Sequence, residues 1–215
     1  MKLSFCGAAA VLAVSLSFTP LQGQGLYFGL RGGAGFPTGA FDEKGSTIGG
    51  NPLLDAAKTG FGYGADAGVQ LGPLGVYAGF DHINFDCESQ SCTAEGKYRL
   101  QGFAAGIKLL PPGVSAIRPW VKGGVTFNQL RGGYGSGNST ELTTDRNPGY
   151  EVGIGLDIRI LGLFQFTPQA RYVGQNFKYR VPGVVNNATE SEQGANYYTL
   201  DLGLQFVNPL KGMRR

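Results

Sequence analysis

Hydrophobic and polar residues alternate along much of this chain, and the alternation is most regular near its end. Between residues 196 and 207, apolar side chains occupy every second position, and polar or small side chains occupy the positions between them. A period of two residues is typical of a β-strand whose two faces meet different surroundings. The leucines of this segment therefore share one face, which is turned either inward to a core or outward to lipid.

Seven earlier segments repeat the alternation, and each has roughly the ten residues that a tilted strand needs to cross a bilayer. The expected strands are residues 26–36, 60–71, 74–85, 97–109, 118–130, 149–160, 163–177 and 196–207. Short turns follow the second, fourth and sixth segments, whereas long polar loops follow the first, third, fifth and seventh. This arrangement predicts an all-β fold, an eight-stranded antiparallel up-and-down transmembrane β-barrel.

The two faces of these segments differ in a way that indicates which one meets lipid. One face is almost free of charge, as contact with lipid requires. The other carries glycine, glutamine and charges of both signs, which suits the narrow lumen of an eight-stranded barrel. Because unpaired buried charge is costly, the charged residues of this face are expected to form an internal ion-paired network. They are Arg31, Asp66, Asp81, Lys108, Lys122, Glu151, Asp157, Arg159, Arg171 and Asp201. Reversing one of them, as in Arg159→Glu, should then destabilise the barrel more than reversing a loop charge.

The composition agrees with a membrane barrel. Charged residues make up 15% of the chain, against roughly 25% in an average soluble domain. The formal net charge of +3 is too small to indicate a nucleic-acid partner. Tyrosines near the strand ends are expected to form aromatic girdles at the two membrane interfaces or, for some of them, to serve as packing residues. They are Tyr27, Tyr63, Tyr98, Tyr150, Tyr172, Tyr179, Tyr197 and Tyr198.

The first 25 residues have the layout of a secretory signal peptide. Lys2 supplies a positive start, residues 3–18 form an uncharged apolar run, and small residues follow near Gly23 and Gly25. Cleavage after either glycine leaves residues 26–207 as the barrel domain and residues 208–215 as a short basic tail. The chain is therefore expected to leave the cytoplasm.

Export brings the remaining cysteines into an oxidising compartment. Cys87 and Cys92 are expected to pair there and close a small loop. The alternative is a metal site that these cysteines form with His82, the only histidine, but no convincing fourth ligand is available. We therefore expect a disulfide and no metal.

The segments RPWVKGGVTFNQL, GYEVGIGLDIRI and YYTLDLGLQFV resemble the later strands of small bacterial outer-membrane barrels of the OmpA, OmpX and opacity-protein type. The resemblance implies an eight-stranded barrel in the outer membrane, with long loops outside the cell and short turns in the periplasm. Such chains commonly end on an aromatic residue that the barrel-assembly machinery recognises. Here Phe206 is followed by VNPLKGMRR, so either the internal LQFV serves instead or recognition is less usual.

The sequence offers little for catalysis. It contains no H-E-x-x-H, G-x-S-x-G or phosphate-loop motif. His82 follows Asp81 and is the one candidate for a general base, but a lone histidine in a strand is more often structural. We therefore expect no enzymatic activity and no cofactor.

Three functions remain open. The first is a structural or surface-interaction role in the outer membrane, in which residues 37–59, 86–96, 131–147 and 178–196 contact an extracellular or host ligand. The second is a narrow passage for ions or a small apolar solute. The third is a soluble exported barrel that binds a hydrophobic ligand.

Overall fold

The computed structural model describes residues 25–42, 47–48, 51–52, 56–87, 97–111, 116–134, 140–179 and 191–209. The signal-peptide prediction lies outside these ranges. Across the described ranges, no helix is both long enough and apolar enough to span a membrane.

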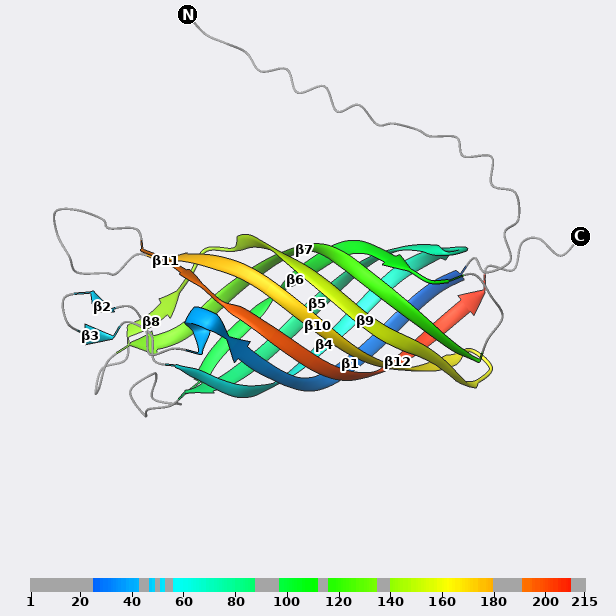
Figure 1. Ribbon diagram of the computed structural model, residues 1–215, viewed down its shortest axis with the longest axis horizontal. Helices are drawn as coiled ribbons and strands as arrows, with labels where there is room; N and C mark the ends of the chain where they lie inside the picture. The colour runs from blue at the N-terminus through cyan, green and yellow to red at the C-terminus, as the bar shows by residue number, and fades with distance from the viewer. Residues whose placement is uncertain are drawn as a thin grey trace, which may run out of the picture.

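Eight long strands form the wall of a closed barrel (Figure 1). They are β1 (Gly25–Thr38), β4 (Ala57–Leu71), β5 (Leu74–Cys87), β6 (Lys97–Leu109), β7 (Ile117–Tyr134), β9 (Asn147–Leu161), β10 (Phe164–Tyr179) and β12 (Asn196–Pro209). Each strand pairs antiparallel with the next one, and β1 pairs with β12 from Gly25↔Pro209 to Thr38↔Asn196, which closes the barrel. The predicted eight-stranded up-and-down barrel is confirmed.

Short turns join the strands at one end of the barrel. Residues 72–73 connect β4 to β5, and residues 162–163 connect β9 to β10. Gly72 (φ 66°) and Gly162 (φ 46°) adopt the left-handed conformation that such tight turns require. β1 begins and β12 ends at this end of the barrel, where Gly25 pairs with Pro209 (Figure 1). We call it the turn end.

The opposite end carries the long connections, and we call it the loop end (Figure 1). Its short elements are η1 (Gly39–Phe41), β2 (Thr47–Ile48), β3 (Asn51–Pro52), β8 (Thr140–Thr143) and β11 (Ser191–Gly194). β8 pairs with the end of β7, and β11 pairs with the end of β10. Both pairings extend the barrel wall beyond its eight-stranded part.

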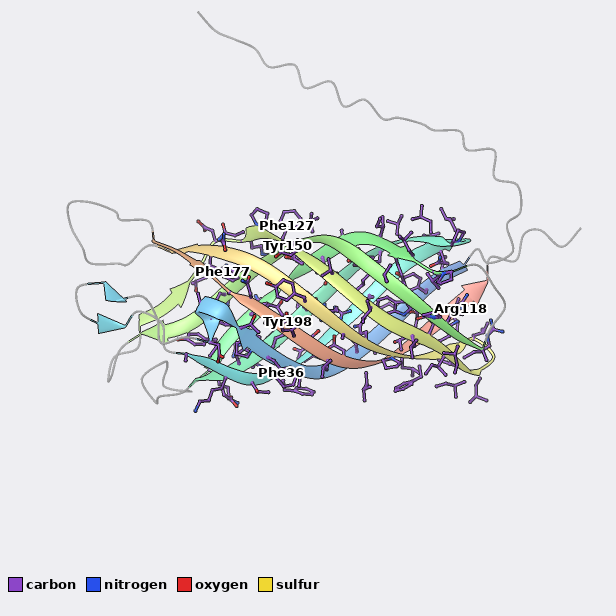
Figure 2. All side chains as sticks on the ribbon, in the orientation of Figure 1. Phe36, Arg118, Phe127, Tyr150, Phe177 and Tyr198 are labelled. Carbon is purple, nitrogen blue, oxygen red and sulfur yellow. The ribbon has the colours of Figure 1, made fainter. Side chains whose placement is uncertain are left out.

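The alternation of the strands places apolar side chains outside the barrel and polar ones inside. In β12, Leu200, Leu202 and Leu204 are 56%, 62% and 52% exposed. The intervening Thr199 and Asp201 are buried. Figure 2 shows side chains standing outward around the barrel wall. The leucines of the last strand therefore face the barrel's exterior.

Apolar side chains fill the lumen at the loop end. We call this cluster the apolar plug: Phe41, Ala57, Ile83, Phe85, Tyr98, Leu100, Leu130, Val173, Phe177, Ala195 and Tyr197. Phe41 of η1 packs against Phe85 and Tyr98, with ring centroids 5.2 and 6.0 Å apart. The inward face is therefore polar along only part of the lumen. In β5, the inward residues after His82, Ile83 and Phe85, belong to the apolar plug.

Several of the strand-end tyrosines are packing residues inside the barrel and not girdle residues. Tyr27, Tyr98 and Tyr197 point into the lumen and are at most 7% exposed. Each lies an even number of positions from the inward residues of its strand and therefore on the same face. We call this the inward parity and the alternate positions the outward parity. Tyrosines on the outward parity are exposed, and Tyr172 contacts two of them with ring centroids 4.9 and 6.1 Å away. These outward tyrosines are Tyr63, Tyr150 and Tyr198. The side chain of Tyr179 lies outside the described residues.

Candidate functional site in the barrel lumen

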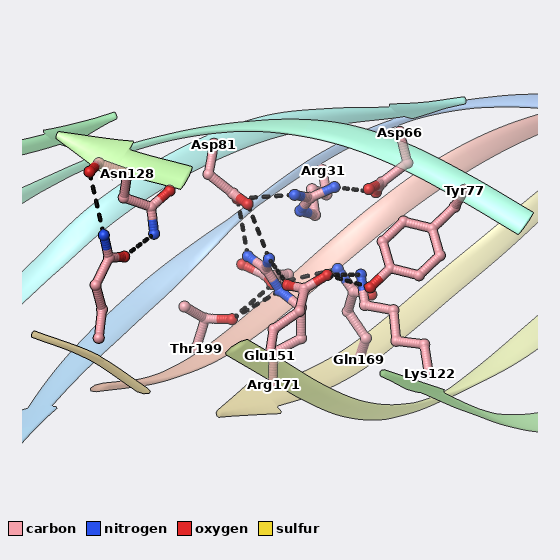
Figure 3. Close-up of polar contacts among 12 residues, drawn as sticks. Arg31, Asp66, Tyr77, Asp81, Lys122, Asn128, Glu151, Gln169, Arg171 and Thr199 are labelled. Atoms are coloured by element: carbon pink, nitrogen blue, oxygen red, sulfur yellow. Dashed lines mark hydrogen bonds and ion pairs between the residues drawn. The ribbon is translucent and has the colours of Figure 1, made fainter. Parts of the chain in front are cut away.

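Arg171 of β10 lies at the centre of the lumen and contacts three carboxylates (Figure 3). Its terminal nitrogens donate to both oxygens of Asp81 at 2.9 and 3.0 Å and to Glu151 Oε2 at 3.1 Å. Its Nε donates to Asp201 Oδ2 at 3.0 Å. These partners come from β5, β9 and β12, so one buried guanidinium connects four strands.

Further side chains extend this cluster across the lumen. Arg31 of β1 donates to Asp66 and, at 2.7 Å, to Asp81. Lys122 Nζ lies 3.7 Å from Glu151 Oε1. Hydroxyl and amide groups donate further hydrogen bonds to these carboxylates. Tyr77 donates to Glu151 at 2.5 Å, and Thr199 and Gln169 donate to Asp201 at 2.8 and 3.2 Å. We call the ten residues named in these two paragraphs the central network.

A second ion pair lies toward the turn end. Lys108 Nζ donates to both oxygens of Asp157, at 2.9 and 3.0 Å. The same ammonium lies over the rings of Trp120 and Tyr27, 4.6 and 5.5 Å from their centroids. Arg118 approaches Asp157 to 4.0 Å. The aromatic faces compensate the buried ammonium for part of its lost hydration.

The structure brings nine of the ten predicted charged residues into these two groups. The exception is Arg159, which is exposed near the end of β9, and its side chain makes no ion pair with any described residue. It belongs to the inward face of β9, but its side chain lines a cavity that opens at the turn end. The exposed position of Arg159 gives no support to the expectation that Arg159→Glu strongly destabilises the barrel, which stays a prediction.

Sequence reasoning missed the uncharged members of the central network. Tyr77, Gln169 and Thr199 have the same parity as the charged residues of their strands, which was the available signal. The strand pattern predicts the face on which a side chain lies, but it does not predict which carboxylate that side chain reaches.

Little free space remains beside the central network. A cavity of about 30 Å³ lies between the central network and Lys108, with Tyr27, Arg31 and Trp120 in its lining, which is room for one or two water molecules. A larger cavity of about 190 Å³ opens at the turn end and is lined by Gln70, Asp157, Arg159 and Gln165 among others. We call this larger space the mouth cavity.

The candidate catalytic and metal groups do not come together. Asp81 points into the lumen, whereas His82 points outward and stacks on Tyr63, with centroids 4.9 Å apart, because successive strand residues face opposite sides. In the part of the chain that the structure describes, no three metal-binding side chains form a group. Cys92 lies outside the described residues, so the Cys87–Cys92 disulfide stays a prediction.

A closed barrel with an apolar exterior and a charged lumen is the architecture of outer-membrane proteins. The model of the outer membrane protein beta-barrel domain matches residues 6–206 of this sequence. The chain belongs to this family. The predicted resemblance and the outer-membrane location are thereby confirmed, and the third hypothesis, a soluble exported barrel, does not fit the family.

Comparison with solved structures finds similar outer-membrane proteins, and OprG and AlkL share this fold. OprG from Pseudomonas aeruginosa is 11% identical, with 85% of this chain and 96% of OprG covered, at a TM-score of 0.53. AlkL in lipid bilayers is 13% identical, with coverages of 93% and 96%, at a TM-score of 0.52. Outer membrane protein W of E. coli is 14% identical, with coverages of 85% and 97%, at a TM-score of 0.47. None of the curated protein sequences matches the chain.

Proposed function

We propose that this outer-membrane barrel is a closed membrane anchor and that its function, structural or surface-interacting, is carried by the connections at the loop end. The observation that carries the proposal is the sealed lumen. Two independent barriers lie in series along the barrel axis, the apolar plug and the central network. The proposal assigns no catalytic role to any residue.

The two barriers oppose different solutes. An ion that enters from the loop end meets a dry cluster of aromatic and aliphatic side chains, where its loss of hydration is costly. An apolar solute that passes the plug meets Arg171 with its three carboxylates, and it would have to separate buried ion pairs to continue. Neither class of solute has an open path through the described part of the lumen.

The loop end supports an interaction role. Barrels of bacterial outer membranes have short periplasmic turns and longer extracellular loops, which assigns the loop end to the cell exterior. Two strand pairs, β7–β8 and β10–β11, continue the wall there and support the long connections. We infer that an extracellular or host ligand binds at this end, and that the barrel-assembly machinery inserts the chain through β12.

Conductance separates this proposal from the second hypothesis, a narrow passage, which the mouth cavity favours. We expect the purified protein in planar bilayers to give no current steps above the protein-free background. A variant that removes both barriers, Phe41→Ala/Phe85→Ala combined with Asp81→Ala/Arg171→Ala, should give small steps if it inserts. Regular steps from the unmodified protein would support the passage instead.

Loop replacement tests the interaction role. Replacing residues 88–96 and 180–190 by short Gly-Ser segments should leave the barrel folded, because loop insertions and deletions cost little stability. Retention of cells on surfaces coated with polysaccharide or with matrix protein should fall for the variant, at equal amounts of heat-modifiable barrel in the membrane. Equal retention on every surface would contradict a role for these loops.

A further inference from the structure

A groove of about 600 Å³ lies in the barrel wall toward the turn end, outside the lumen cavities described above. Its lining is almost entirely apolar and comes from β6, β7, β9 and two turns. The lining residues are Pro73, Leu109, Leu110, Pro111, Pro119, Trp120, Val121, Ile154, Gly155 and Leu156. We call it the wall groove.

The groove exists because β6 ends early. The β6–β7 pairing stops at Leu109↔Val121, whereas β7 continues toward the turn end and pairs there only with β9. On the lumen side of this wall, Gly155 of β9 makes room for the indole of Trp120, because a Cβ at this position would lie 2.4 Å from Cζ2 of that ring. Trp120, which is 4% exposed, therefore lies behind the groove, on the lumen side of the wall.

Positive charge gathers where the same two strands reach the mouth cavity. Arg118 of β7 is the register partner of Asp157 on β9, and Arg159 is two residues further along β9. Asp157 is already bound by both of its oxygens to Lys108. Three cations and one carboxylate give this site a formal charge of +2. Leu110 lines both the wall groove and the mouth cavity, so the apolar and the cationic regions adjoin.

We propose that the wall groove binds one glycerophospholipid of the periplasmic leaflet, with an acyl chain in the groove and the anionic phosphate beside Arg118 and Arg159. The groove opens on the membrane face, where water is excluded and acyl chains are the available occupants. Its volume lies within the roughly 300–1,000 Å³ of small-molecule sites. Arginine is the side chain best suited to phosphate.

The indole of Trp120 lies on the lumen side of the wall behind the groove. Residue 120 shares the inward face of β7 with Lys122, and its ring lies 4.6 and 5.9 Å from the ammonium nitrogens of Lys108 and Lys122. An acyl chain in the groove is therefore separated from this ring only by the barrel wall. An apolar chain and a phosphate follow one another along a phospholipid, as the groove and the arginines do in the protein.

The site can be tested by fluorescence because Trp120 is the only tryptophan of the chain. The protein is reconstituted in phosphatidylcholine vesicles that contain increasing mole fractions of phosphatidylglycerol brominated on its acyl chains, and quenching of Trp120 is measured. Brominated phosphatidylcholine serves as the zwitterionic comparison. We expect half-maximal quenching at a lower mole fraction of the anionic lipid, by about fivefold for each arginine (~1 kcal/mol).

Matched variants separate a specific site from ordinary lipid contact. Val121→Phe fills the groove and should raise the mole fraction for half-maximal quenching at least about fourfold, since losing one buried methylene costs ~0.8 kcal/mol. Val125→Phe, on the same outward face of β7 but outside the groove, should not change it. Ile154→Phe replaces Val121→Phe if that variant fails to insert. Equal curves for the groove variant and its control would overturn the proposal.

The arginines are tested in the same assay. Arg118→Gln/Arg159→Gln should abolish the preference for the anionic lipid, whereas Arg131→Gln, near the loop end, should retain it. A preference that survives in the double variant would overturn the assignment of the phosphate, and with it the proposed lipid. Heat-modifiable migration shows that each variant is inserted before it is measured.

Discussion

Replacing Arg171 by methionine is expected to lower the free energy of unfolding by about 3–5 kcal/mol, as for other buried ion pairs that lose one partner. The side chain is 3% exposed and contacts Asp81, Glu151 and Asp201. Methionine fills a similar volume but leaves these carboxylates without their shared cation. Their mutual repulsion inside a narrow lumen then acts directly against the folded state.

Urea unfolding in phospholipid vesicles, followed by the heat-modifiable gel shift, measures this loss. Lys58→Met is the matched control, because Lys58 is also a cationic residue but is exposed at the loop end of β4. Its effect should stay within about 0.5 kcal/mol, as for surface substitutions away from special features. Equal losses for the two variants would mean that the central network does not stabilise the barrel.

Introducing a charge on the exterior is expected to have the next largest effect. Leu202 lies at the middle of β12 and is 62% exposed, so its side chain meets the bilayer centre. Leu202→Arg should destabilise the barrel by about 2–4 kcal/mol, the cost of a cationic side chain at the midplane of a membrane barrel. The same unfolding assay applies.

Depth along the wall provides the control. Leu26 is also exposed and outward, but it pairs with Asn208 near the turn end of the barrel. Leu26→Arg can reach the interface and should cost only about 0–1 kcal/mol. A smaller loss for Leu202→Arg than for Leu26→Arg would show that the bilayer is centred elsewhere on the barrel.

The strands could be predicted from the sequence because the pleat of a β-strand enforces a period of two wherever its faces meet different surroundings. All eight expected segments overlap the long strands of the barrel. Their ends were less predictable. β7 was expected at residues 118–130 and spans Ile117–Tyr134. The apolar alternation stops at Arg131, whereas the strand continues through its pairing with β8.

For the lumen, the sequence predicts on which face of a strand a side chain lies, but not which other side chain it contacts. Inward parity placed Arg171 and Asp81 in the lumen. Whether they meet depends on their positions along the barrel axis, which the register of several intervening strands determines. The same limit explains Arg159, which lies on the inward face of β9 but too close to the turn end to reach the central network. Ile83 and Phe85 also have the inward parity. Their packing with Phe41 of η1 in the apolar plug could not be predicted, because it joins elements that are distant in the sequence.

The wide separation of the central network along the chain has a consequence for how the protein assembles. Arg171 and Asp81 are 90 positions apart, and Arg31 and Asp81 are 50 apart. In an open sheet, Arg171 can already reach Glu151 and Asp201 on the neighbouring strands, but its contact with Asp81 of β5 exists only across a closed lumen. Apolar surroundings penalise a carboxylate that lacks its partner. Pairing of β1 with β12 completes this contact, so we expect insertion into the bilayer and closure of the barrel to be coupled.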